Sequence, residues 1–478
     1  MSDTENSPES ERLNEIVYYD GDDRDVYTYI KYFESNFPLS YKEVEDSVAK
    51  ENIKSDYNYF ISVVTSFLIY EWDVFKDLIR IERNLNSLSN QDLKLYPLRN
   101  IESEIDKYRS CIKVNQNFFK LMLSPDLYFQ IAETKSRSNP TKNNVKSKNK
   151  YKGNSNRNKS QETLSKYRHG NVSNNVVTQG NNNICCDSED CLCYSLKNEK
   201  YMGGFNLNTV PSTTMHNISK AKATLRQFVR DWSEHGEAER SESYDPILKA
   251  LVKYLPLDIS NPRRQKVLVP GAGLGRLLFE VAKLGYSCQG NEISYAMLLG
   301  SNFILNYMFE KNSIRIYPYL FSLSNRPKKE DNLRPVFIPD VCINEYVKYG
   351  HDLSMCAGEF VEVYSNQIQI WDAVLTCFFL DTAKNIITYI RTIINLIPPN
   401  GVWINLGPLL YHYSGMNDVV SIELSWEEIR EIISKYFNIV EEEWKDATYT
   451  RNNQSMFKVV YKCIFFVAIR NQVPFVDY

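Results

Sequence analysis

Long apolar runs, cysteine and histidine are all scarce in this 478-residue sequence. No stretch approaches the ~18 consecutive apolar residues of a membrane-spanning helix, and residues 1–25 lack the apolar segment of a secretory signal. Ten cysteines are too few for a disulfide scaffold, so we expect free thiols. Five histidines leave few candidate ligands, and we predict no metal site. These features together favour the cytoplasm, with the nucleus as a second location.

Net charge is also small. The chain has 56 Lys and Arg and 59 Asp and Glu, so its net charge is −3. This value argues against a chain that binds nucleic acid or membranes through its overall charge. Hydrophobic residues make up 43% and aromatic residues 13%, which excludes wholesale disorder. The length predicts two or three domains.

The first half of the chain divides into three regions by composition. Residues 1–25 form an acidic tail, predicted to be disordered. Residues 26–133 contain no glycine, and their apolar positions recur at helical spacing, as in Phe60, Val63, Val64 and Phe67. This region is predicted to be all-helical, with three or four long helices that cover the substrate face of the following domain and could form a homodimer interface.

Residues 134–213 are rich in Lys, Asn and Ser. Between residues 135 and 168 there are eleven Lys or Arg and one acid, Glu162, with almost nothing apolar. The lack of interleaved aromatics favours a solvated, disordered insertion over a nucleic-acid-binding segment. Cys185, Cys186, Cys191 and Cys193 cluster here, but their spacing is not that of paired zinc-binding CxxC motifs, so exposed thiols are predicted.

Residues 214–478 alternate strand and helix patterns. The predicted strands are residues 266–270, 287–292, 371–378 and 402–406, and the predicted helices are residues 274–284 and 383–396. This order predicts an α/β fold with a doubly wound, Rossmann-like parallel sheet covered by helices on both faces. A last apolar strand, residues 457–469, is expected to pair antiparallel at the sheet edge.

A glycine-rich turn follows the first of these strands. Gly271, Gly273 and Gly275 allow the backbone to approach a ligand, and Arg276 stands where a dinucleotide fingerprint would place a further glycine. The spacing instead fits the turn that binds S-adenosylmethionine. Glu292 ends the second strand, where a carboxylate can accept hydrogen bonds from both ribose hydroxyls.

Several longer motifs then resemble one family. The run VLVPGAGLGRLLFEVAKLGYSCQGNEISYAMLLGSNFILN is preceded by TLRQFVRDWSEHGEAER and followed by TCFFLDTAKNIITYI, INLGPLLYHY and IELSWEEI. Together they are similar to the carnosine N-methyltransferase family over about residues 224–467. The resemblance implies a methyltransferase fold, S-adenosyl-L-methionine as cofactor and a histidine-containing dipeptide as substrate.

The resemblance also implies which residues bind the cofactor. Gln227 and Arg230 match positions at its methionine end, with Arg230 as the cation for the carboxylate. Cys377 and Phe378 match the segment beside the methionine moiety. The remaining matches are Gly271 in the glycine turn, Glu292 at the ribose, and Glu359 and Phe360 at the adenine, where the family pattern has Asp in place of Glu359.

On the substrate side, Asp381, His412, Tyr449 and Tyr461 match positions that hold the imidazole dipeptide. Val459 falls where the family pattern has a Tyr, which removes one polar contact. Without the resemblance, Asp381 would be interpreted as the N-cap of a helix over residues 382–396, and His412 as an ordinary half-buried histidine.

The implied reaction is methylation of the imidazole nitrogen nearer Cβ, which converts carnosine to anserine. Asp381 would accept the proton of the other ring nitrogen and so select the tautomer, while His412 and Tyr461 would anchor the rest of the dipeptide. Two alternatives remain open from the residues alone. One is a methyltransferase acting on histidine in a protein or on another macromolecule, and the other is a catalytically silent scaffold with the cofactor fold.

Overall fold

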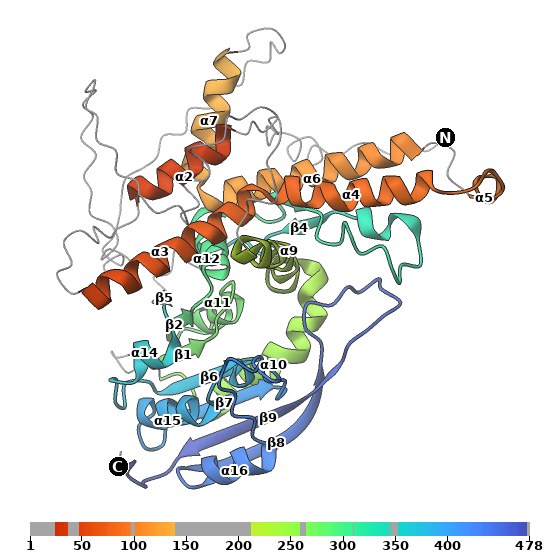
Figure 1. Ribbon diagram of the computed structural model, residues 1–478. Helices are drawn as coiled ribbons and strands as arrows, with labels where there is room; N and C mark the ends of the chain where they lie inside the picture. The colour runs from red at the N-terminus through yellow and green to blue at the C-terminus, as the bar shows by residue number, and fades with distance from the viewer. Residues whose placement is uncertain are drawn as a thin grey trace, which may run out of the picture. The chain divides into compact units, whose positions relative to one another are not determined.

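The structure is a computed structural model that describes residues 24–36, 47–96, 101–138, 212–258, 264–308, 310–343, 345 and 352–475 (Figure 1). Residues 1–23 of the predicted acidic tail, most of the insertion and its four-cysteine cluster lie outside the described residues, while residues 24 and 25 belong to the first described helix. The chain divides into two compact units, Met1–Ala221 and Lys222–Tyr478. None of the described helices is long and apolar enough to cross a membrane.

The N-terminal unit is helical, as predicted. Its helices are α2 (Arg24–Asn36), α3 (Ser47–Leu68), α4 (Tyr70–Asn86), α5 (Asn90–Leu95), α6 (Ile101–Leu123), α7 (Pro125–Ser138) and the start of α9 (Ser212–Trp232). The break between α3 and α4 is stabilised by the buried Gln116 side chain, which accepts from Glu71 N at 2.8 Å and donates to Phe67 O at 3.0 Å. Helix α7 continues to Ser138, beyond the expected end of the helical region at residue 133.

The C-terminal unit contains a seven-stranded sheet of order β5-β2-β1-β6-β7-β9-β8. Its strands are β1 (Lys266–Pro270), β2 (Ser287–Glu292), β5 (Leu353–Ala357), β6 (Ala373–Cys377), β7 (Val402–Gly407), β8 (Phe437–Ala447) and β9 (Tyr461–Arg470). A separate antiparallel ribbon joins β3 (Ile314–Ile316) and β4 (Val336–Ile338). The helices are α10 (Glu237–Tyr254), α11 (Arg276–Lys283), α12 (Tyr295–Tyr307), α14 (Phe360–Tyr364), α15 (Ile386–Leu396) and α16 (Trp426–Ser434), with short 3-10 turns η4 (Glu234–Gly236), η5 (Lys329–Leu333) and η6 (Leu380–Thr382).

Helices cover both faces of the sheet, which confirms the predicted fold class. In β1, Val267 and Val269 point to a core shared with α10 and α11, whereas Leu268 points to a second core shared with α15 and α16. Because each residue of a central strand is buried on one face or the other, the strand reads as a continuous apolar run.

The sheet differs from the prediction at both edges. One edge is β5, which the sequence analysis did not predict. Strand β9 lies between β7 and β8 and is antiparallel to both, so its antiparallel pairing was predicted correctly but its place at the edge was wrong. The other edge is β8, which the sequence analysis missed because its run of charged residues, Glu441 to Glu443, hides the strand pattern. Charged side chains are common on edge strands because they discourage pairing with other chains.

The strand order positions a ligand site. The chain leaves β1 toward β2 and β5 on one side, then returns to β6 and β7 on the other. Ligands of open α/β sheets bind in the crevice outside the carboxyl ends of the strands, at the place where the order reverses. In this fold that place lies between the loops that follow β1 and β6.

Candidate active site

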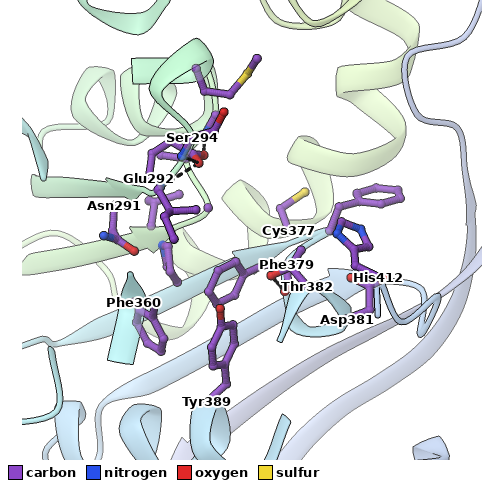
Figure 2. A pocket seen from close by; sticks show the side chains of 18 of the residues that line it. Asn291, Glu292, Ser294, Phe360, Cys377, Phe379, Asp381, Thr382, Tyr389 and His412 are labelled. Carbon is purple, nitrogen blue, oxygen red and sulfur yellow. Dashed lines mark hydrogen bonds between the residues drawn. The ribbon is translucent and has the colours of Figure 1, made fainter. Parts of the chain in front are cut away.

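A cavity of about 750 Å³ occupies this crevice. Every residue that the sequence analysis proposed for the site lines it, with the exception of Gly275. In the view of Figure 2, Glu292 and Asp381 lie on opposite sides of Phe379. The cavity therefore brings together residues from across the domain, Gln227 to Tyr461.

The glycine turn presents bare backbone to the cavity. Gly271 and Gly273 have φ of +65° and +55°, in the left-handed region that favours glycine. A Cβ on Gly271 would lie 2.6 Å from the Phe379 ring, whereas a Cβ on Gly273 would have only Asp231 Oδ2, at 3.9 Å, within 4 Å. Gly273 thus leaves open space in the cavity wall that a side chain would fill.

Gly275 has a different role. It is the N-cap residue of α11, with φ of +83°, and a Cβ there would lie 3.1 Å from Leu305 Cδ1 of α12. It shapes the start of the helix and does not line the cavity. The prediction that Gly275 contacts the cofactor is therefore not supported by its position.

Glu292, at the end of β2, is tied to the turn by its own carboxylate. Oε2 accepts from Gly273 N at 2.9 Å, and Oε1 accepts from Ile293 N at 2.9 Å and Ser294 N at 2.8 Å. Burial raises the pKa of Glu292, and these three backbone N–H groups oppose that rise. The carboxylate therefore organises the glycine turn as well as facing the cavity.

The predicted cation, Arg230, is buried in a polar cluster. Its Nη1 donates to Asp231 Oδ1 at 2.9 Å and to the Tyr244 hydroxyl at 2.5 Å, and its Nε lies 3.0 Å from Glu239 Oε1. The Tyr244 hydroxyl donates to the same Asp231 oxygen at 2.8 Å. Because two carboxylates balance its charge, Arg230 is fixed in the cavity wall without a bound ligand.

Aromatic rings border the cavity near Arg230. Phe378 adopts φ of +51°, unusual for a residue with a Cβ, and its ring centroid lies 5.0 Å from that of Tyr449 and 5.9 Å from that of Tyr461. Gln227 Nε2 donates to the Tyr449 hydroxyl at 2.6 Å. The strained Phe378 backbone therefore places one ring against both predicted substrate tyrosines.

The predicted adenine pair follows β5. Glu359 is the N-cap of α14, where its Oε2 accepts from Glu362 N at 2.9 Å. Phe360 is only 2% exposed and packs against Phe379 and Tyr389, which stack at 4.9 Å. The longer Glu side chain is thus engaged in capping its own helix.

Cys377 ends β6 in the cavity wall. Burial raises the pKa of its thiol to about 11, an effect that the nearby Arg230 opposes. The thiol stays protonated at neutral pH, so Cys377 can form part of the wall but is a poor nucleophile.

Asp381, in η6 after β6, is 4% exposed. Its Oδ2 accepts from Leu410 N at 3.0 Å, and its backbone O accepts from His412 N at 3.0 Å. Burial raises the pKa of the carboxyl, while the Leu410 N–H and the charge of His412 oppose the rise. These bonds place Asp381 beside the exposed His412 side chain (Figure 2).

The helix-cap interpretation of Asp381 is wrong. Helix α15 begins at Ile386, later than expected, and its N-cap is Asn385, whose Oδ1 accepts from Ile387 N at 3.0 Å. Asp381 lies a turn earlier and its carboxylate is bonded to the loop after β7. Its burial at the cavity therefore needs another explanation.

The sequence analysis missed further residues that line the cavity, among them Asp231 and Tyr389. Asp231 is 2% exposed and pairs with Arg230, and Tyr389 stacks on Phe379. An acid directly after the predicted cation was a signal for Asp231. Tyr389 gave none, because a tyrosine within an apolar helix pattern is ordinary core composition.

The cavity fits S-adenosylmethionine on these observations. Open space at Gly273 admits a ligand against the backbone, and the buried carboxylates of Asp231 and Glu292 suit a ligand that carries an ammonium, a sulfonium and a ribose. Among the described residues, no group of three or more His, Cys, Asp or Glu could hold a metal ion. Fold and site together define an S-adenosylmethionine-dependent methyltransferase.

Comparison with known proteins narrows this class. Residues 207–472 match the carnosine N-methyltransferase family, and the chain belongs to that family. Carnosine N-methyltransferase of Mus musculus is 46% identical over 285 residues, which cover 59% of this chain and 70% of the mouse protein. The protein of the same description from Schizosaccharomyces pombe is 36% identical over 299 residues, or 59% of this chain and 80% of the yeast protein. The chain is an N-methyltransferase.

Solved structures give only a weak likeness. Magnesium protoporphyrin IX methyltransferase from Synechocystis PCC 6803, with bound SAH, is 13% identical and has a TM-score of 0.32. The match covers 53% of this chain and 95% of that one. It adds nothing to the assignment.

Proposed function

We propose that this protein transfers the methyl group of S-adenosylmethionine to carnosine, at the imidazole nitrogen nearer Cβ, and so forms anserine. The observation that carries the proposal is the buried Asp381 carboxylate. It lines the same cavity as the glycine turn, and helix capping does not account for it. Family membership supports the substrate, while the position of methylation rests on Asp381.

The cofactor would be held mainly by the loops after β1, β2 and β5. Gly271 and Gly273 would offer backbone along it, Glu292 would accept from the ribose hydroxyls, and Glu359 and Phe360 would border the adenine. Gln227 and Arg230 would contact its methionine end, next to Cys377 and Phe378. When bound, the cofactor supplies the electrophilic methyl group.

Asp381 would position the acceptor. A neutral imidazole has one nitrogen with a proton and one with a free lone pair, and the partner of the N–H decides which is which. An Asp381 oxygen that accepts from the distal ring N–H leaves the lone pair of the nitrogen nearer Cβ free to attack. The carboxylate also stabilises the positive charge that the ring gains as it is methylated.

His412 and Tyr461 would hold the remainder of the dipeptide. The His412 backbone is bonded to the Asp381 backbone, so the two side chains are placed by one loop contact. Tyr461 begins β9, and its ring packs edge-on against Phe378. Both residues line the cavity within the same domain, and neither needs a macromolecular partner to be positioned.

The test is to incubate the purified full chain with methyl-labelled cofactor and a panel of carnosine, other histidine dipeptides and histidine-containing proteins. NMR of the product identifies the methylated nitrogen. We expect carnosine to be methylated at the nitrogen nearer Cβ. Label confined to proteins would support the macromolecular alternative, and methylation at the distal nitrogen would reject the orientation given to Asp381.

A further inference from the structure

The turn that carries Tyr449 is held by one buried carboxylate. This turn, residues 448–451, follows β8, and Tyr449 lines the catalytic cavity from it. Glu239 of α10 is 2% exposed, and it accepts from Thr450 N at 2.6 Å and from Arg451 N at 3.1 Å. Thr450 has φ of +49°, in the left-handed region that a residue with a Cβ seldom adopts. The Glu239 carboxylate therefore holds an unfavourable backbone conformation directly after Tyr449.

The same carboxylate also contacts the residue assigned to the cofactor carboxylate, Arg230. Glu239 Oε1 lies 3.0 Å from Arg230 Nε, so one oxygen contacts both the guanidinium and the backbone of Thr450. The Arg230 guanidinium in turn lies over the Tyr449 ring, 4.7 Å from its centroid, where a cation is attracted to the aromatic face. Glu239 therefore joins a residue assigned to the cofactor to the turn of a residue assigned to the substrate.

A second acid on α10 holds the same turn in a different way. Glu242 lies three residues after Glu239, on the same face of the helix. It accepts from Thr448 N at 3.0 Å and from the Thr448 hydroxyl at 2.7 Å, and it forms an ion pair with Arg451 Nη1 at 2.9 Å. Within the described residues, none of its hydrogen bonds or ion pairs reaches Arg230. Both acids hold the turn, but Glu239 also contacts the cofactor cation.

We propose that Glu239 is a positioning residue that couples the binding of the cofactor to the binding of the dipeptide. The inference rests on the proposed function, because that function assigns Arg230 to the cofactor and Tyr449 to the dipeptide. A cofactor carboxylate at Arg230 stabilises the position of the guanidinium further, and the ion pair with Glu239 extends this stabilisation to the turn. The dipeptide then binds to a turn that fluctuates less, at a lower cost in conformational entropy. Each ligand therefore tightens the binding of the other by the same factor.

The experiment is calorimetry of carnosine binding to the purified full chain, with and without saturating S-adenosylhomocysteine. The wild type should bind carnosine about 10-fold more tightly when S-adenosylhomocysteine is present. Glu239→Gln keeps an amide oxygen for the turn but loses the charge that faces Arg230, so this factor should fall below about threefold. The reverse titration, of S-adenosylhomocysteine with and without saturating carnosine, should give the same factors.

Glu242→Gln is the matched control. It weakens a second contact to the same turn without touching Arg230, so carnosine should bind less tightly in both titrations while the factor stays at its wild-type value. An equal loss of the factor in the two variants would overturn the coupling, because loosening of the turn alone would then explain it.

A further variant separates coupling from the stability of the turn. Thr450→Gly, added to Glu239→Gln, relieves the left-handed backbone and should recover part of the melting temperature. The coupling factor should stay low, because the charge that faces Arg230 is still absent. Recovery of the factor together with the melting temperature would overturn the proposal and would leave Glu239 a purely structural role.

The wild type distinguishes this inference from the proposed function. A protein that methylates carnosine but binds it equally well with and without S-adenosylhomocysteine would overturn the coupling and leave the proposed function intact. A protein that neither binds nor methylates carnosine would reject the proposed function and the coupling with it.

Discussion

Two buried carboxylates face the same cavity from opposite halves of the sheet, and their surroundings differ. Glu292, after β2, accepts from three backbone N–H groups of the turns around it. The Asp381 carboxylate, after β6, accepts from the N–H of Leu410 in the loop after β7. The cofactor half of the site is therefore built into the backbone, while the proposed substrate half presents a carboxylate with acceptor capacity to spare.

The largest effect is expected at Glu292. Glu292→Ala should weaken S-adenosylmethionine binding by about 2–4 kcal/mol, because two charge-assisted hydrogen bonds to the ribose are lost. It should also lower the melting temperature, since Gly273 N, Ile293 N and Ser294 N lose their acceptor. Titration calorimetry and thermal unfolding measure the two effects.

Glu292→Gln is the matched control. It keeps one carbonyl oxygen for the backbone donors and should recover part of the melting temperature, but less of the affinity. Unchanged calorimetric affinity in Glu292→Ala would remove this residue from the cofactor site and would leave it a purely structural role in the turn.

A more selective effect is expected at Asp381, which should change turnover and leave cofactor affinity and the melting temperature largely intact. Asp381→Asn should lower turnover on carnosine by at least ~10²-fold, because the amide cannot accept the ring proton as a carboxylate does. Cofactor affinity should persist, since Asp381 is assigned to the substrate. Single-turnover rates measure the loss of turnover, and calorimetry with S-adenosylhomocysteine measures the affinity of the cofactor site. Near-normal turnover would reject the orienting role.

The sequence analysis identified the strands and Glu292 in the cofactor half of the site, but it did not predict that the Glu292 carboxylate also holds the glycine turn. Strands β1 and β2 were predicted to the residue. The run of β1 begins at Lys266 and ends before the glycine turn, and the run of β2 follows Gly285 and ends at Glu292. Glu292 was found from its place at the strand end. Its three backbone bonds were not foreseen, because they depend on the path of a turn that spacing alone does not define.

The last third of the chain was harder to predict. Asp381 was found through a family resemblance, since an acid shortly before a helix usually caps it. The structure removes that interpretation through Asn385, which no periodicity distinguishes from its neighbours. Strand β8 was missed because its charged residues resemble a loop. Strand β9 was placed at the edge because the order of strands in a sheet is a tertiary property that the sequence pattern does not give.

A direct test of the cap assignment compares Asn385→Ala with Asp381→Asn. The Asn385→Ala variant loses the bond to Ile387 N, and its free energy of unfolding should fall by about 1 kcal/mol. Asp381→Asn should change it by less, because the amide oxygen can still accept from Leu410 N. Urea unfolding of both variants at neutral pH gives the comparison. A larger loss in Asp381→Asn would restore a structural role for this carboxylate.

The smallest effect is a pH dependence of stability. Because burial raises the pKa of Asp381, the folded chain holds this proton more tightly than the unfolded chain does. Stability from this group is therefore present below its ordinary pKa and is lost as pH rises to the raised value. The amide in the Asp381→Asn variant does not titrate. The pKa of Glu292 shifts in the same direction as that of Asp381, but Glu292 is present in both proteins, so its contribution cancels in the difference between their unfolding free energies. The unfolding free energy of the wild type minus that of Asp381→Asn should thus fall as pH rises through this window and then level off. A difference that grows with pH would show that the folded protein stabilises the Asp381 carboxylate, and it would contradict the raised pKa assigned to this buried group.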